Sequence, residues 1–335
     1  MKLLEVNDLT VAFPTENGDK NAVNHISFDL EENDFVGLVG ESGCGKTVAT
    51  QTILGIQSKE AIVKSGSCKL EGIEVLGFSD KEWEKYRSRS IATVFQEPGS
   101  ALNPLIKVGK QIEEVLIIHY DFDKIKRKNL VLETMKACGL NDVENLYNKY
   151  PHELSGGMQQ RIVIAMSLIA NPNVLIADEP TTALDAKVKA QIIDLFKEIS
   201  RIYKGAIVFI SHDLNLIERI SKTIMIMYAG RLVEKGQTSQ LIANPLHPYT
   251  KALLKAVPSF KKRGQRLYNI KGHVPDLKNR SNNACPFADR CDYTMDICLK
   301  KYPKSYSKGN HLVDCHLYGE NHGWNSKNWT HKQNL

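Results

Sequence analysis

Gly40-Glu-Ser-Gly-Cys-Gly45-Lys46-Thr47 is the stretch of this sequence that decides the fold. It fits the pattern G-x-x-x-x-G-K-[ST], whose glycines let backbone N–H groups curl around phosphate oxygens. The apolar run FVGLVG, at residues 35–40, precedes the loop as a buried strand would, and residues 48–55 can continue as a helix. This order predicts a phosphate-binding loop, because the helix N-terminus directs its positive dipole end at the anion.

The fixed positions of this loop each have a predicted task. Lys46 places a cation near the β- and γ-phosphates of a nucleotide, and Thr47 offers its hydroxyl group to Mg²⁺. The Cys44 side chain is interpreted as a small filler of the loop and not as a ligand. The loop residues predicted to form the nucleotide site are Gly40, Ser42, Gly43, Cys44, Gly45, Lys46, Thr47 and Val48.

A second strand pattern supplies the acidic partner that such a loop needs. In Val174-Leu-Ile-Ala-Asp178-Glu179 four apolar residues suit a parallel strand buried on both faces, and two carboxylates follow at its carboxyl end. Asp178 is predicted to bind Mg²⁺ directly or through water. Glu179 is predicted to accept a proton from the water that attacks the γ-phosphate. Alone, two acidic residues after a strand are a weak signal, so both predictions depend on the pairing with Lys46.

A third motif, Leu154-Ser-Gly-Gly-Met-Gln-Gln-Arg161, places Ser155 as the N-cap of a helix that runs to about Ala170. Its two glycines allow close backbone approach, so it is a second candidate phosphate-binding helix terminus. Two such termini with one loop lysine indicate that the second serves a nucleotide held by another molecule. A capped helix without any ligand is the alternative for this stretch taken alone.

These motifs together resemble the ATPase subunits of ABC transporters, and LSGGMQQR is close to that family's signature. The resemblance implies that two subunits dimerise head to tail, with each ATP between the Lys46 loop of one chain and the Ser155 helix of the other. It implies that Glu179, His212 and Gln96 arrange hydrolysis, Gln96 also contacting Mg²⁺. The remaining nucleotide contacts that it implies are Phe13, stacked on adenine, then Ser155, Gly156, Gly157 and Gln159 of the signature, and Asp185 in the dimer-contact loop Ala183-Leu184-Asp185.

A narrower resemblance comes from residues 95–104, FQEPGSALNP, and residues 244–254, NPLHPYTKALL, which look like segments of the oligopeptide/dipeptide importer branch. It implies an ATP-hydrolysing subunit on the cytoplasmic face of the membrane, bound peripherally. The implied partners are a second, usually different, ATPase subunit, two membrane permease subunits and, indirectly, an extracellular peptide-binding protein. A nickel-chelate or other small-solute cargo, and a soluble ABC ATPase acting on nucleic acid or ribosomes, remain alternatives.

The expected fold is α/β: a P-loop NTPase, RecA-like parallel sheet with an antiparallel β edge, an inserted helical subdomain and a cysteine-bearing C-terminal extension. The nucleotide-binding core is assigned to residues 1–96 and 159–236, and the extension, more loop-like, to 237–335. Residues 97–158 are assigned to the helical subdomain, because LIKVGKQIEEVLIIHY, residues 105–120, has apolar residues at helical spacing.

Four of the seven cysteines lie in the tail with the spacing C-x5-C-x6-C-x16-C. Disulfides are disfavoured in a chain expected in the cytosol. Spacing alone leaves zinc and an iron–sulfur cluster open. The resemblance implies a [4Fe-4S] cluster, with zinc as the alternative, and a cluster that regulates would make the chain a metal-tail sensor. The implied ligands are Cys285, Cys291, Cys298 and Cys315, with His311 and His316 as less favoured substitutes.

Composition and charge narrow the remaining classes. The chain is 42% hydrophobic and 24% charged, as in ordinary soluble globular proteins, and its first residues read as a strand and not as a signal peptide. The longest apolar run is too short to span a membrane. The net charge of +6 is spread among acidic residues, except for a basic patch at residues 261–263. No aromatic platform accompanies that patch, so a solvated loop is favoured and no nucleic-acid partner is expected.

Overall fold

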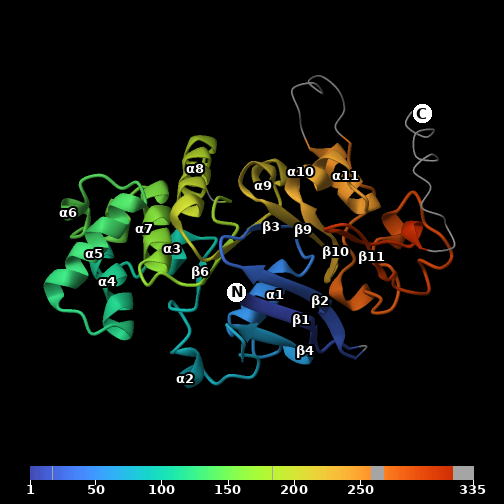
Figure 1. The fold of residues 1–335 in the computed structure, drawn as a ribbon, viewed down its shortest axis with the longest axis horizontal. Coiled ribbons are helices and arrows are strands. Elements are labelled where there is room, and N and C mark those ends of the chain that lie inside the picture. Colours follow the sequence, from blue (N-terminus) through green and yellow to red (C-terminus); the bar gives the residue numbers. More distant parts are fainter. Residues whose placement is uncertain (17, 183, 258–267, 320–335) are drawn as a thin grey trace.

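The computed structural model describes residues 1–16, 18–182, 184–257 and 268–319, and its centre is a sheet of eight strands (Figure 1). Strands β9, β3, β8, β7 and β6 run parallel in that order, and β10, β12 and β11 continue one edge antiparallel. The strand bounds are β3 Phe35–Val39, β6 Ile91–Val94, β7 Val174–Asp178, β8 Ala206–Ser211, β9 Thr223–Tyr228, β10 Arg231–Gln237, β11 Ser305–Lys308 and β12 His311–Asp314.

The parallel strands are buried on both faces, which is why their sequences read as continuous apolar runs. Every residue of β3 and β8 is buried. Because side chains alternate along a strand, Phe209 faces one hydrophobic cluster while Val208 and Ile210 face another. The sheet is therefore held between two cores, and its strand ends are fixed at one common edge.

A second sheet packs over one of these faces. It has the antiparallel order β2-β1-β4-β5, and α1 lies between it and the main sheet, where Leu4 and Leu30 share a core with Ile53 of α1 and Val208. Figure 1 shows this sheet beneath the central strands. The bounds are β1 Lys2–Phe13, β2 Lys20–Glu31, β4 Ile62–Leu70, β5 Ile73–Glu74 and α1 Lys46–Ile53.

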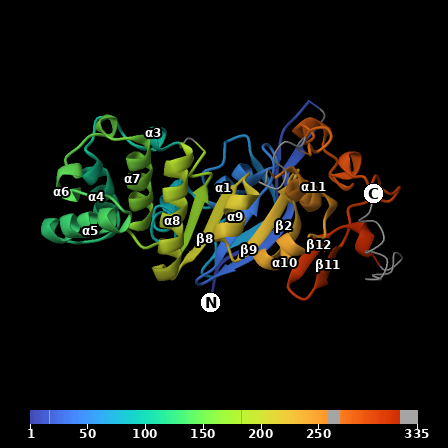
Figure 2. The same cartoon turned by 90° about the horizontal axis from the view of Figure 1, so that it is seen from above.

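Helices cover the other face and extend the molecule to one side. Helices α4, α5 and α7 pack on one another beside α3 and α6, in a group that lies at the end of the molecule opposite the C-terminal segment (Figures 1 and 2). The helix bounds are α2 Asp80–Trp83, α3 Pro98–Ala101, α4 Val108–His119, α5 Lys124–Ala137, α6 Val143–Leu146, η1 Pro151–Glu153, α7 Gly156–Leu168, α8 Ala186–Ile202, α9 Leu214–Ile220, α10 Thr238–Ala243 and α11 Pro248–Ala256.

The C-terminal extension is more integrated with the core than its sequence indicates. Its strand β12 pairs with β10, joining Val313 to Glu234 and Leu312 to Lys235. Strand β11 pairs with β12, so the extension lengthens the main sheet by two strands. Three short 3-10 turns, η3 Leu277–Asn279, η4 Ala288–Arg290 and η5 His316–Tyr318, complete its described part. The basic patch at 261–263 lies outside the described residues.

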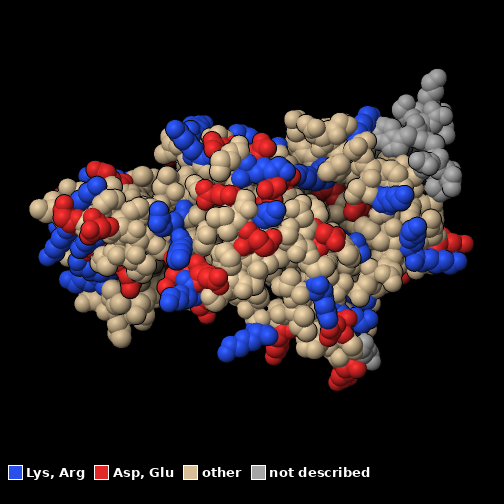
Figure 3. All heavy atoms as spheres, turned by 60° about the horizontal axis from the view of Figure 1, so that its bottom comes forward, with Lys and Arg blue, Asp and Glu red and all other residues tan. Residues whose placement is uncertain are grey.

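The surface carries both signs of charge. On the face drawn in Figure 3, Lys and Arg side chains lie among Asp and Glu side chains over most elements. Within the described residues, none of the helices combines the length and the apolar character that crossing a membrane requires.

Candidate functional site

Two glycines in the loop between β3 and α1 could not be replaced by another residue unless neighbouring atoms moved. An ideal Cβ atom on Gly40 would lie 2.3 Å from the Met227 carbonyl oxygen and 2.6 Å from Cys44 Sγ. Gly45 has a φ of 106°, in the left-handed region, and a Cβ there would lie 2.5 Å from the Ala22 carbonyl oxygen. Gly43 is also left-handed, and a Cβ on it would meet nothing within 4 Å. The loop therefore lies against the ends of β2 and β9 on one side and leaves open space beside Gly43.

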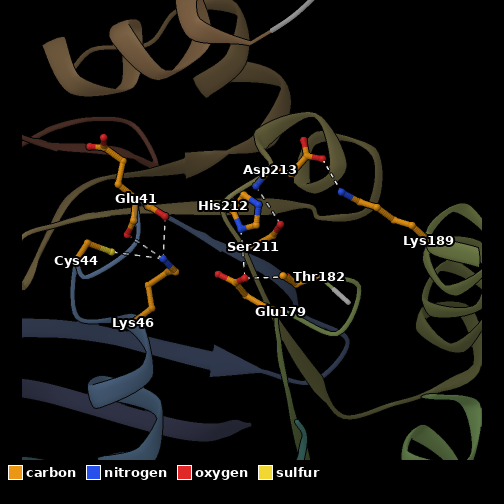
Figure 4. A network of polar contacts seen from close by, with 10 residues as sticks. Glu41, Cys44, Lys46, Glu179, Thr182, Lys189, Ser211, His212 and Asp213 are labelled. Carbon is orange, nitrogen blue, oxygen red and sulfur yellow. Dashed lines mark hydrogen bonds and ion pairs between the residues drawn. The ribbon is translucent and has the colours of Figure 1, made fainter. Parts of the chain in front are cut away.

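Lys46 lies inside this loop, as Figure 4 shows. Its ammonium donates to the carbonyl oxygens of Gly40 and Glu41, at 2.7 and 3.1 Å, and approaches Cys44 Sγ at 3.6 Å. Burial raises the pKa of the Cys44 thiol although Lys46 opposes this, so Cys44 fills the loop as a neutral side chain. Helix α1 has no side-chain N-cap and no acidic residue in its first turn. Its N-terminal N–H groups therefore suit an external anion.

Other predicted loop residues surround this centre. Ser42 and Thr47 are exposed, whereas the partly buried Val48 packs against the core below. Phe13 ends β1 opposite Lys20 of β2, at the end of the hairpin that brings Ala22 beside Gly45. Its ring is half-buried and lies on the antiparallel sheet, separate from the strands that carry the carboxylates.

Asp178 is the last residue of β7 and Glu179 is the next residue in the chain. Both lie at the same edge of the sheet as the loop, because β7, β8 and β3 are parallel neighbours. Burial and the nearby Glu179 raise the pKa of Asp178, and Lys46 lowers it. Glu179 has a φ of 45°, a conformation that costs an ordinary residue about 1 kcal/mol or more. Its N–H donates to the Ile210 carbonyl oxygen at 3.1 Å, and Thr182 Oγ1 donates to its carboxylate at 2.8 Å. These bonds hold Glu179 in the strained position.

His212 completes the group at this edge. It follows Ser211, the last residue of β8, and its Nδ1 lies 3.2 Å from Glu179 Oε2 (Figure 4). The His212 side chain is 56% exposed and that of Glu179 is 18% exposed, so the imidazole lies on the solvent side of the pair and the carboxylate lies deeper. Gln96 lies two residues beyond Val94, the end of β6, and is exposed. Since β6 is parallel to β7, the structure brings Gln96, Asp178, Glu179, His212 and Lys46 to one edge.

The signature segment lies elsewhere. Ser155 is the N-cap of α7, and its Oγ accepts from the Met158 N–H at 3.4 Å. Both ribbon views place α7 with α4 and α5, to one side of α1 (Figures 1 and 2). A Cβ on Gly156 would come no closer than 4.0 Å to Leu184, whereas one on Gly157 would lie 2.7 Å from Val188 Cγ1. Gly156 therefore faces open space, and Gly157 lets α7 pack against α8.

Gln159 and Asp185, both predicted to contact nucleotide, form hydrogen bonds within their own chain. The Gln159 side-chain amide donates to the carbonyl oxygens of Pro151 and Leu154, at 2.7 and 3.3 Å. Asp185 is the N-cap of α8, and its Oδ1 accepts from the N–H groups of Lys187 and Val188 at 3.0 Å each. Ala183, predicted beside it in the dimer-contact loop, lies outside the described residues.

Comparison with known proteins agrees with this geometry. Residues 23–182 match the family model "ABC transporter", and residues 233–298 match "Oligopeptide/dipeptide transporter, C-terminal region". The chain is 41% identical over 318 residues to a dipeptide transport ATP-binding protein of Bacillus subtilis, covering 94% of this chain and 95% of that protein. It is 40% identical to the oligopeptide transport ATP-binding protein of Salmonella typhimurium, covering 92% of this chain and 91% of that one.

The chain belongs to the ABC transporter ATP-binding subunits of the oligopeptide/dipeptide importer family. Solved structures support the fold of this ABC ATPase subunit. A dimeric ATP-binding cassette in a post-hydrolysis state with ADP and Pi matches with a TM-score of 0.62 and 27% identity, covering 70% of this chain and 98% of that one. A Clostridium perfringens cassette from an ABC transporter complex matches with a TM-score of 0.63 and 25% identity, covering 72% and 91%. The predicted P-loop fold is confirmed.

The predicted metal site in the C-terminal extension of this ABC ATPase subunit is not found among the described residues. Cys285, Cys291, Cys298 and Cys315 line one cavity, but its volume is about 10 Å³, room for about one water molecule. Within the described ranges, no group of three or more His, Cys, Asp or Glu side chains is arranged to hold a metal ion. The [4Fe-4S] prediction is therefore wrong for this structure, and the zinc alternative has no ligand set either. His311 instead pairs with the buried Glu234 at 2.7 Å, and His316 contacts the Lys301 carbonyl oxygen at 2.8 Å.

Proposed function

We propose that this chain hydrolyses ATP to drive an importer of oligopeptides or dipeptides. The observation that carries the proposal is the convergence of the Lys46 loop, Asp178 and the Glu179–His212 pair at one edge of the parallel sheet. The cargo class rests on the match to the oligopeptide/dipeptide C-terminal model and on the names of the relatives, which are peptide transport ATP-binding proteins.

Phosphate and metal binding are assigned to the loop and to three oxygen-bearing side chains. N–H groups of residues 40–48 and the Lys46 ammonium would hold the β- and γ-phosphates. Thr47, Gln96 and Asp178 would hold Mg²⁺, whose charge neutralises the phosphate oxygens when it is bound. Burial and the neighbouring Glu179 raise the pKa of Asp178, and a cation bound beside Asp178 would stabilise its carboxylate.

The hydrolytic water is assigned to Glu179. Its carboxylate would accept the water proton while the water oxygen attacks the γ-phosphorus. Thr182 and His212 both contact Oε2 of Glu179, at 2.8 and 3.2 Å, and would fix the direction of the carboxylate. Gln96, on the neighbouring strand end, would orient the same water from the γ-phosphate side.

The second half of each site would come from a second ATPase subunit, in this branch usually a different chain. Ser155, Gly156 and Gly157 lie on α7, to one side of the Lys46 loop, and Gly156 faces open space. A nucleotide on the partner's loop would occupy that space, with Gln159 and Asp185 near the contact and Phe13 against its own adenine. The dimeric ADP-bound cassette that matches this fold supports a two-chain site.

The membrane partners would be two permease subunits, with the peptide-binding protein acting outside the cell. The helical group presents large apolar side chains to solvent: Leu105 is 84% exposed and Ile118 is 65% exposed. Leu105 precedes α4 and Ile118 lies in the last turn of α4, and exposed apolar side chains of this kind suit contact with a permease. We place the chain peripherally at the cytoplasmic face on this basis.

The substitution Glu179→Gln tests the function. It keeps the side-chain length and an oxygen for Thr182 but removes the base, so hydrolysis should fall by about 10²–10⁴-fold while ATP binding persists. Glu198→Gln, an exposed carboxylate on α8, is the matched control and should hydrolyse like the wild type. Unchanged turnover in Glu179→Gln would contradict the assignment. Purification from membranes should also recover permease subunits, and recovery of RNA or ribosomes in their place would contradict the transport role.

A further inference from the structure

Three side chains from the C-terminal extension contact the phosphate-binding loop. The Glu41 N–H donates to the Tyr249 hydroxyl group at 3.0 Å. Arg290 donates to both carboxylate oxygens of Glu41, from Nη1 at 2.8 Å and from Nη2 at 3.1 Å. Arg280 Nη2 donates to the carbonyl oxygen of Gly43. The loop is thus held from outside by residues more than 200 positions later in the chain.

Arg290 has a buried side chain that is hydrogen-bonded to several neighbouring groups. Its side chain is 5% exposed, its Nε donates to the Lys271 carbonyl oxygen at 2.7 Å, and Nη1 also reaches the Tyr228 hydroxyl group at 3.2 Å. Phe287, three residues earlier, packs against the rings of Tyr228 and Tyr249. A bidentate arginine–carboxylate ion pair with a fixed guanidinium sets both the orientation and the position of the carboxylate. The docked extension therefore fixes the position of the Glu41 side chain.

Arg280 holds the next part of the loop. It is 7% exposed, and its Nε and Nη1 donate to the carbonyl oxygens of Pro275 and Ala22, at 3.1 and 3.4 Å. Its bond to the Gly43 carbonyl oxygen fixes the peptide plane between Gly43 and Cys44. In a trans peptide the C=O and N–H point in opposite directions, so this bond turns the Cys44 N–H to the other side. That N–H donates to the Glu41 carbonyl oxygen, which also accepts from Lys46.

Glu41 consequently connects the extension to Lys46, the lysine of the phosphate-binding loop. Its backbone carbonyl oxygen accepts from Lys46 at 3.1 Å, and its carboxylate points away from Lys46 (Figure 4). The carboxylate accepts from Arg290. We propose that Arg280 and Arg290 are positioning residues for nucleotide binding, through which the docked C-terminal extension sets the shape of the phosphate-binding loop. The inference rests on the proposed ATP site at that loop.

The test compares ATP affinity and thermal stability in the full-length chain. In Arg290→Met, the Kd for a fluorescent ATP analogue should rise about tenfold, equivalent to about 1.4 kcal/mol. KM should rise in parallel while kcat at saturating ATP stays within about twofold, because the lost contact acts on the loop before chemistry. Arg290→Lys keeps the charge but loses the bidentate interaction, so its Kd should lie between those of the wild type and Arg290→Met. Lys271→Met removes an exposed ion pair with Asp292 in the same segment and should bind like the wild type.

A double substitution shows whether Arg290 acts through Glu41. Glu41→Gln with Arg290→Met should bind ATP no more weakly than Arg290→Met alone, because both remove one interaction. Additive losses, or an unchanged Kd with a lowered Tm in Arg290→Met, would overturn the inference and leave a structural staple. If Arg290→Met does not fold, Arg290→Lys and Glu41→Gln decide by the same measurement. Wild-type binding by Lys46→Ala would instead overturn the proposed ATP site itself.

Discussion

The two signature glycines face different surroundings, and exchanging each for alanine separates folding from function. A methyl group on Gly156 would lie 4.0 Å from Leu184, ordinary contact, so stability should be unchanged or rise by up to about 1 kcal/mol. A methyl group on Gly157 would lie 2.7 Å from Val188, and moving α7 off α8 should cost about 1–3 kcal/mol. Gly157→Ala is therefore the destabilised variant, and Gly156→Ala is not.

For ATP hydrolysis we expect a specific loss in Gly156→Ala, the variant that is not destabilised. The space in front of Gly156 is assigned to the γ-phosphate of the partner's ATP, so Gly156→Ala should have a Tm no lower than the wild type and should bind ATP at its own loop. Its hydrolysis in the assembled transporter should fall by about 10²-fold, because a methyl group displaces the phosphate by about 1 Å. Thermal unfolding and steady-state ATPase assays give both readouts. Wild-type hydrolysis by Gly156→Ala, or a wild-type Tm for Gly157→Ala, would refute the reasoning.

Two further predictions concern carboxylates. Glu113 is 2% exposed and bonded to Lys110, Tyr147 and Arg127, which outweigh burial and lower its pKa from 4.5 to about 2. Because its pKa is lower in the folded than in the unfolded chain, ionised Glu113 contributes about 3 kcal/mol to the free energy of unfolding. This contribution is present above pH 4.5 and is lost as the pH falls toward 2. Glu113→Gln should remove it, as denaturant unfolding at pH 7 and pH 3 would show; equal losses at both would contradict the assignment. Asp178→Asn should raise the Mg²⁺ concentration needed for hydrolysis, and a wild-type Mg²⁺ titration would exclude Asp178 as a ligand.

The sequence predicted the parts of the site that depend on local patterns. Gly40, Gly45 and Lys46 could be placed because a strand, a loop and a helix follow one another directly. The start of α7 was equally local, since Ser155 is its N-cap as predicted. Helix α4 begins at Val108 and not near Leu105, because Asn103 Oδ1 accepts from the Leu105 N–H and holds that residue in a turn.

Features that join distant segments could not be predicted. Strands β11 and β12 lie in a segment that reads as a loop, and β10, the strand that joins this hairpin to the main sheet through β12, is far away in the chain. The pairing of Glu41 with Arg290 spans 249 positions, and neither residue belongs to a motif that would indicate it. The cysteine spacing failed for a related reason: it shows that thiols are near one another in sequence but not how much room their side chains leave.

Vanadate-directed photocleavage tests the two-chain nucleotide site most directly. With Mg²⁺ and ADP, orthovanadate takes the place of the γ-phosphate, and ultraviolet light then cleaves the backbone beside it. Applied to the assembled transporter and read by mass spectrometry, it should give fragments of this chain ending within residues 40–47 and also within residues 155–157. Cleavage confined to residues 40–47 would contradict an ATP held between the Lys46 loop of one chain and the Ser155 helix of another.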